Sequence, residues 1–106
     1  MISKYNNKRL NTQDGWFDSH AEFTRWQELK LLEKAGEIRS LQRQVRFTLI
    51  PKCGRLREIV YIADFVYEKA PDWKQVVEDK KGFRSKVYML KWRLMQFRHG
   101  IEILET

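Results

Sequence analysis

Residues 76–83 read VVEDKKGF, and this stretch decides how the fold is interpreted. Two valines lead directly into two acids and two lysines, so apolar core residues are followed at once by four charges. Side chains alternate between the two faces of a strand. One face would therefore carry Val77, Asp79 and Lys81, and the other Val76, Glu78 and Lys80. We expect a strand that begins in the core and ends at a polar site.

Two further strands are predicted ahead of this one. Residues 41–50 alternate between apolar and polar side chains, and PKCGR at 51–55 is a turn signal. Residues 58–67 are apolar on both faces except at Asp64, which is typical of a strand covered on both sides. APDW then turns the chain into the strand at 74–81. We expect these three strands to be joined by hairpins.

One helix is expected before the three strands in the sequence and another after them. Ser19 is a candidate N-cap with Glu22 three residues later, and Gly36 lies where a left-handed C-terminal residue is expected. Ser85 and Gly100 bracket a second helix, in which apolar residues recur at three- and four-residue steps. The stepped residues are Val87, Leu90, Leu94 and Phe97.

The predicted order is helix, three strands, helix and a short final strand at residues 101–104. A helix between the last two strands implies that these strands pair in parallel, whereas hairpins make the other pairs antiparallel. We expect one α/β domain over residues 1–106, with an α-β-β-β-α-β core in which a mixed central sheet is flanked by helices. Residues 1–15, which are polar and basic, are expected to form an irregular N-terminal arm.

The charge balance favours a polyanionic partner. The chain has 106 residues with 21 Lys and Arg against 14 Asp and Glu, a net charge of +7, which points to nucleic acid before an acidic membrane surface. A solvated basic surface is the alternative. No apolar run approaches the roughly 20 residues of a membrane span, no signal-peptide pattern is present, and Cys53 is the only cysteine. We expect a cytoplasmic protein that binds DNA and no membrane.

Asp64 is the strongest functional clue, because burying an ionised carboxylate without a partner costs several kcal/mol. An Asp paired with Arg, or capping a turn, is the structural alternative. If the strand at 74–81 pairs with the strand that carries Asp64, one acid from each would converge, and two close carboxylates repel unless a divalent cation lies between them. Oxygen ligands suit Mg²⁺ or Mn²⁺. With a lysine two residues after the second acid, the pattern predicts metal-assisted phosphodiester hydrolysis.

An Asp followed 15 residues later by an Asp/Glu-x-Lys triplet, after a helix that carries Glu, resembles the PD-(D/E)XK nuclease superfamily. The predicted order of elements is similar to the core of that superfamily. The closest resemblance is to a group of small, poorly characterised phage and prophage proteins of that fold. It rests on FDSHAEF, WQELKLLEKAGEI, QVRF, YIADF and VVEDKKGF, which extend over nearly the whole chain.

The resemblance implies roles for individual residues. Asp64 and Asp79 would ligate Mg²⁺, for which Mn²⁺ would substitute, and Lys81 would be the catalytic lysine. Glu22 would be an auxiliary carboxylate that ligates the metal directly or through water, although a capping box alone also explains an acid there. Gln44 matches a Gln of the family pattern, and it either lines the site or is solvated.

One departure from the family pattern leaves a second triplet open. Lys80 stands where the relatives carry an apolar residue, so the sequence also permits Glu78-x-Lys80 in a register flipped by one residue. We favour Asp79 and Lys81 because the family pattern ends in Lys-Gly, which Lys81-Gly82 matches.

The basic residues of the arm and the second helix are expected to contact DNA phosphates, which supplies affinity without sequence information. No segment resembles a recognition helix, so we expect a structure-selective endonuclease for branched or recombining phage DNA, which could act as a homodimer. The alternative is a non-catalytic DNA-binding accessory phage protein on the same fold. The candidate contacts are Lys4, Lys8, Arg9, Arg84, Lys86, Lys91, Arg93 and Arg98.

Overall fold

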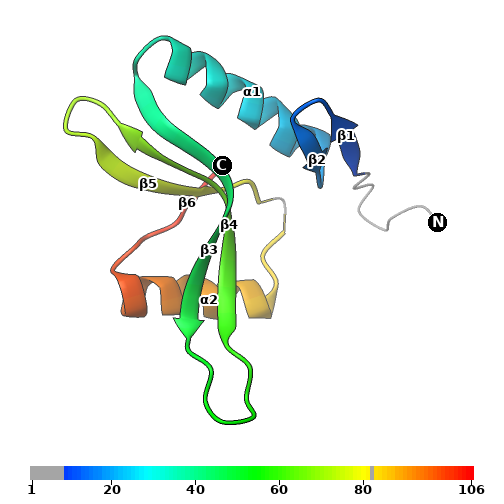
Figure 1. Cartoon of the computed structure of the whole chain (residues 1–106), viewed down its shortest axis with the longest axis vertical. Coiled ribbons are helices and arrows are strands. Elements are labelled where there is room, and N and C mark those ends of the chain that lie inside the picture. Colours follow the sequence, from blue (N-terminus) through cyan, green and yellow to red (C-terminus); the bar gives the residue numbers. More distant parts are fainter. Residues whose placement is uncertain (1–8, 82) are drawn as a thin grey trace.

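The computed structural model of the chain describes residues 9–81 and 83–106. Two helices and a four-stranded sheet make up most of it, and a separate two-stranded hairpin precedes them (Figure 1). The mixed α/β class is therefore confirmed. The elements in order are β1 (Leu10–Thr12), β2 (Gly15–Phe17), α1 (His20–Lys34), β3 (Ile38–Ile50), β4 (Ile59–Lys69), β5 (Lys74–Asp79), α2 (Lys86–His99) and β6 (Leu104–Glu105).

The four-stranded sheet has the order β3-β4-β5-β6. β3 pairs with β4 and β4 with β5 in antiparallel fashion, whereas β5 and β6 are parallel. The parallel pair follows from α2, because a helix between two strands returns the chain to the end of the sheet from which it left. The predicted mixture of hairpins and one parallel crossover is confirmed.

The strand ends differ from the predicted ones where the chain's last residues pair with β5. β5 ends at Asp79, so Lys80 and Lys81 lie beyond the strand instead of completing it. The segment after β5 still bonds to the neighbouring chain: the N–H of Thr106 donates to the carbonyl of Asp79, and its carbonyl accepts from the N–H of Lys81. The final strand is the two-residue β6 and not residues 101–104, since Ile101 still bonds back to the carbonyl of Met95 in α2.

The predicted helix caps are present. The hydroxyl of Ser19 accepts from the N–H of Glu22 at 3.1 Å, and that of Ser85 accepts from the N–H of Tyr88 at 3.0 Å. Gly100 ends α2 with φ of 67°, the left-handed conformation that glycine adopts without a steric penalty. Within the described ranges, neither helix combines the length and the apolar character that crossing a membrane requires.

Two apolar clusters hold the helices to the sheet. α1 packs on a cluster around Leu29 and Phe65, and α2 packs on a second one around Tyr61, Ala63 and Met95. Figure 1 shows α1 at one end of the sheet and α2 crossing β3 and β4 at the other. Along β4, Ala63 belongs to the cluster under α2 and Phe65 to the cluster under α1. Asp64 lies between these two residues.

Of the four apolar residues that predicted α2, only Leu94 packs against the core, and it is partly buried. Tyr88 and Met95 are buried against the sheet, whereas Val87, Leu90 and Phe97 are 64%, 55% and 88% exposed. The helix is therefore correct and its inward side is a different one. Tyrosine and methionine pack inward because they reach the cluster around Tyr61 and Ala63 with large side chains.

The N-terminal arm was predicted to be irregular to residue 15, and for residues 10–15 this was wrong. β1 and β2 form an antiparallel hairpin, closed by the hydroxyl of Thr12, which donates to the carbonyl of Gly15 at 2.9 Å. Arg43 of β3 fastens it, because its guanidinium lies 3.5 Å from the ring centroid of Phe17 and donates to the carbonyl of Trp16 at 2.6 Å. The predicted contacts Lys4 and Lys8, like Gly82, lie outside the described residues.

Candidate active site

Asp64 and Asp79 face each other on neighbouring strands. The register pairs Phe65 with Glu78, so Asp64 and Asp79 are the next opposed residues along β4 and β5, and their side chains share one face. Their carboxyl groups are hydrogen-bonded to each other. Asp79 is only 2% exposed. The convergence of one acid from each strand is therefore present in the fold.

The environment of this pair suppresses its ionisation. Burial, followed by the hydrogen bond to Asp79 and the negative charges of Asp79 and Glu22, raises the pKa of Asp64 to about 9, although the backbone N–H of Lys80 donates to its Oδ2 at 2.9 Å. Asp64 therefore carries a proton at neutral pH in the metal-free protein. The two carboxyl groups thus hold one proton between them, and the pair carries one negative charge and not two.

Asp79 is oriented by a phenol and approached by a lysine. The hydroxyl of Tyr61 donates to Oδ2 of Asp79 at 2.6 Å, and burial together with the charge of Asp79 raises the pKa of this phenol, which keeps it a donor. Nζ of Lys81 lies 3.7 Å from the same Oδ2 and 4.4 Å from the ring centroid of Tyr88. The cation thus stands beside the carboxyl pair with its position set by an aromatic face.

Glu22 joins the pair from the first turn of α1. It is 4% exposed, forms a hydrogen bond with Asp64, and accepts from the side chain of Gln44 at 3.2 Å and from the N–H of Asp18 at 3.2 Å. Burial raises its pKa, with the charge of Asp18 acting in the same direction. Ser19 caps the N–H of Glu22, but the carboxylate is turned toward Asp64 and does not return to Ser19 as a capping box would require.

Gln44 reaches Glu22 from an uncommon backbone conformation. Its φ of 52° is left-handed, which few non-glycine residues adopt. This conformation occurs at the point of β3 where the side chain contacts the carboxylate of Glu22. The predicted alternatives for Gln44 were lining the site or solvation, and the structure places its amide at the site.

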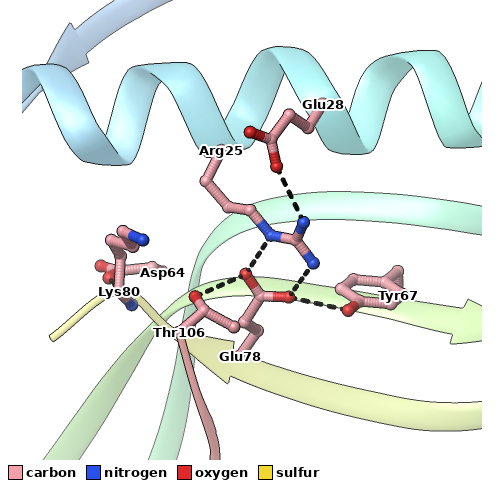
Figure 2. A network of polar contacts seen from close by, with 7 residues as sticks. All are labelled: Arg25, Glu28, Asp64, Tyr67, Glu78, Lys80 and Thr106. Atoms are coloured by element: carbon pink, nitrogen blue, oxygen red, sulfur yellow. Dashed lines mark hydrogen bonds and ion pairs between the residues drawn. The ribbon is translucent and has the colours of Figure 1, made fainter.

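Glu78 points to the other face and is fully enclosed. Its carboxylate accepts from Nε of Arg25 at 2.7 Å and from Nη2 at 3.0 Å, from the hydroxyl of Tyr67 at 2.7 Å, and from that of Thr106 at 3.0 Å (Figure 2). It is 0% exposed. Its charge is neutralised by a guanidinium, and both of its oxygens are occupied.

The alternative triplet of Glu78 and Lys80 is therefore not assembled. Figure 2 shows the side chain of Lys80 turned away from Glu78, and the contribution of Lys80 to the acids is its backbone N–H, which binds Asp64. Asp79 and Lys81 are the members of the two candidate triplets that the structure brings to Asp64.

The donor chemistry of this cluster fits a hard divalent cation. Asp64 and Asp79 present carboxylate oxygens to each other, and Glu22 adds a third carboxylate next to Asp64. In residues 9–81 and 83–106, no three Asp, Glu, His or Cys side chains are arranged as ready-made ligands of one ion. The fit is thus that of two carboxylates with a third one hydrogen bond away, as for Mg²⁺, which keeps several water ligands.

A cleft of about 900 Å³ opens onto the acids. It lies between the start of α1, the end of β5 and the start of α2. Its lining includes Ser19, Glu22, Asp64, Lys80, Lys81 and Phe83. Asp79 is buried and does not line the cleft, so a ligand in the cleft would contact Asp64, Glu22 and Lys81 first.

None of the predicted basic contacts that the structure describes lines this cleft. Arg9 lies 3.8 Å from Asp18 at the cleft edge and stacks on Trp16, and Arg84 forms an ion pair with Glu105 beside Lys81. The remaining described candidates are on α2: exposed Lys86, Arg93 and Arg98, with Lys91 half-buried. Arg84 is therefore partly neutralised, whereas the basic residues of α2 form no ion pair within residues 9–81 and 83–106.

Two tyrosines were missed by sequence reasoning, and both act on the site through other residues. Tyr61 precedes Asp64 by three positions, which on a flat strand would place it on the opposite face. Its long side chain nevertheless reaches Asp79. Tyr88 lies on α2, where its ring supports Lys81 and its hydroxyl donates to Glu105. No sequence signal in a single chain identifies such partners, because they meet only after α2 packs on β4.

Comparison with known proteins gives one match. A family model described as a protein of unknown function, DUF1064, matches residues 2–103. No curated protein and no solved structure matches the chain. Since the family model extends over nearly the whole sequence, the chain belongs to the DUF1064 family.

Proposed function

We propose that this protein is a divalent-metal-dependent DNA endonuclease. The observation that supports the proposal is the opposed pair Asp64 and Asp79 on adjacent strands, buried together with Lys81 as the nearest cation. A structural ion-pair network would have been closed by a guanidinium, as Glu78 is by Arg25. In the cleft, by contrast, Asp64 keeps a proton beside Asp79 and Glu22, and a bound cation would take the place of that proton.

Asp64 and Asp79 would hold the ion, Mg²⁺ or Mn²⁺, with Glu22 directly adjacent. When bound there, the ion supplies Lewis-acid polarisation of the scissile phosphate. Glu22 lines the cleft and has a raised pKa, so it is suited to accept a proton from a water molecule. Lys81 places its ammonium where charge builds up on the phosphate oxygens and stabilises it. Hydrolysis forms one P–O bond to water and breaks one to the leaving nucleotide oxygen.

The substrate we propose is branched or recombining DNA, cut by structure and not by sequence. The net charge of +7 and the unpaired basic residues of α2 support phosphate contacts without base readout. We further propose that the protein acts as a homodimer in the cytoplasm of a phage-infected host cell, during recombination or replication. This setting rests on the sequence resemblance.

The test is cleavage of labelled four-way, flap, single-stranded and linear duplex DNA with Mg²⁺, Mn²⁺ or EDTA. Asp64→Asn and Asp79→Asn should each lower the metal-dependent rate by roughly 100-fold or more, since even outer partners of metal ligands change metal affinity 10- to 100-fold. Glu102→Gln is the matched control, because Glu102 is an exposed acid outside the cleft and should leave the rate unchanged.

Failure would have a defined meaning. If no substrate is cut with either metal while salt-sensitive DNA binding persists, the protein is an accessory DNA-binding protein. If Asp64→Asn and Asp79→Asn cut at the wild-type rate, the carboxyl pair is not the catalytic site.

A further inference from the structure

The hairpin between β3 and β4 carries a basic tip, residues 51–58, which lies outside the cleft. Residues 51–58 project beyond α2, away from the rest of the sheet (Figure 1). Lys52, Arg55 and Arg57 are exposed there, and Leu56 between the two arginines is 71% exposed. Three cations on a protruding hairpin form a surface that is separate from the cleft.

The positive charge of this tip is not compensated. Glu58 is the only acid in the segment, and Arg46 of β3 already forms an ion pair with it. In the part of the chain that the structure describes, Lys52, Arg55 and Arg57 have no ion pair. Exposed like charges repel one another, so a fold that gathers three of them is stabilised by an anionic ligand.

The turn at the tip is closed by backbone hydrogen bonds. Cys53 and Leu56 exchange two backbone hydrogen bonds, of 3.1 and 2.8 Å, around a two-residue turn in which Gly54 has φ of 56°. An ordered tip loses less conformational entropy on binding than a loose loop would. A two-stranded ribbon of this kind is also an element that the major groove of B-DNA admits.

The distance between the tip and the cleft is set by β4. Leu56 lies eight residues before Asp64, which in extended chain is at most about 26 Å. Because nucleotides of one strand are spaced about 3.4 Å apart along duplex DNA, the tip would contact the duplex at most about eight base pairs from the scissile phosphate. One copy of the chain would then contact the duplex at two separated points.

We infer that the β3–β4 hairpin is a second duplex-DNA contact, in which Lys52, Arg55 and Arg57 bind the backbone and groove within about eight base pairs of the cut. This inference rests on the proposed function, and it adds the requirement for a duplex arm on one side of the cleavage point. Binding should therefore favour junctions and flaps over single strands.

The first test measures binding to a labelled duplex in EDTA, so that cleavage plays no part. The triple variant Lys52→Gln, Arg55→Gln, Arg57→Gln should lower the slope of log affinity against log salt by about three, at about 0.9 per lost phosphate contact. The matched control is Lys34→Gln, Lys69→Gln, Lys74→Gln, which removes the same charge from exposed positions outside the hairpin. The control should change the slope by less than one.

The second test uses Cys53, the only cysteine, which is exposed at the tip. An iron-chelate cleavage reagent attached to Cys53 should cut bound duplex at one localised position, within about eight base pairs of the enzymatic cleavage site. Uniform cutting along the duplex, or none while the protein is bound, would overturn the inference.

The outcomes separate the inference from the proposed function. If the hairpin triple and the control triple bind DNA alike, the hairpin is not a DNA contact, and the proposed nuclease stands. If the wild-type protein does not bind DNA at all, both are overturned. Binding of the wild type, but not of the hairpin triple, to phosphatidylserine vesicles in place of DNA would assign the tip to a membrane surface instead.

Discussion

Glu78 and Asp79 are consecutive acids on β5, almost equally buried, and opposite in their electrostatic surroundings. Glu78 is enclosed by Arg25, Tyr67 and Thr106, so its charge is neutralised and its oxygens are saturated (Figure 2). Asp79 faces another acid, Asp64, with one phenol as donor and an ammonium at 3.7 Å. Two equally buried acids can therefore differ in their partners, and it is the partner that decides whether the charge is neutralised.

The difference has an energetic consequence that can be measured. Removing one partner of a closed buried ion pair leaves a charge uncompensated, which destabilises the fold. At neutral pH Asp64 is protonated in the folded protein but ionised in the unfolded chain, so replacing it with a neutral side chain removes the cost of that proton uptake and should stabilise the fold. The two faces of one strand should therefore respond to substitution with opposite signs.

The largest effect is expected at Glu78. Glu78→Ala strands Arg25 beside an emptied buried site and should lower the free energy of unfolding by about 3–5 kcal/mol. Urea unfolding in EDTA measures it. Glu78→Met combined with Arg25→Met should recover most of the loss, because apolar packing replaces the pair. A cost below about 1 kcal/mol for the single substitution would contradict a closed network.

Asp64→Asn should act in the other direction. In EDTA, the free energy of unfolding should rise by at least about 1 kcal/mol, since a carboxyl held away from its ordinary pKa by burial and by two neighbouring acids is replaced by a neutral amide. The same substitution should abolish stabilisation by Mn²⁺, which thermal unfolding with and without the ion would show. A destabilised Asp64→Asn that still responds to Mn²⁺ would mean that the pair is structural.

Tyr61 offers a finer test of the cleft. Tyr61→Phe removes the donor to Asp79 and should weaken Mn²⁺ binding about 10- to 100-fold, with a loss of stability of about 1 kcal/mol in EDTA. Calorimetric titration with Mn²⁺ provides the readout. Tyr88→Phe is the matched control, because it keeps the ring beside Lys81 and loses only the bond to Glu105, so Mn²⁺ affinity should stay within about twofold.

The smallest effect is expected at Asp14, an acid without a buried environment. Hydrogen bonds from Trp26 and Lys30 lower the pKa of Asp14, so its contribution to stability is present above its unfolded pKa and is lost as the pH falls through the lower folded one. Asp14→Asn should therefore be less stable than wild type at pH 6, with the difference shrinking toward pH 3. Urea midpoints at the two pH values test this, and an unchanged difference would contradict it.

Much of the fold could be predicted from the sequence because local signals carry it. Ser19, Ser85 and Gly100 mark helix ends through hydrogen bonds and backbone angles that need only a few neighbouring residues. The parallel pairing of the last strand follows from the helix before it. The stepped apolar residues of α2 predicted a helix correctly, but not which side is buried, because periodicity gives the helix and packing selects the face.

The candidate site was predicted in its members and not in its arrangement. By itself, the sequence determined that Asp64, Asp79 and Lys81 are chemically unusual, since charges follow a core strand directly. Only the tertiary structure decided between Asp79 and Glu78, because the choice depends on register, and a shift of one residue exchanges the faces. It also brought in Tyr61 and Arg25, whose roles exist because distant segments meet. Local interactions fix where elements begin and end, whereas the neutralisation of a buried charge depends on whatever group the packed fold places against it.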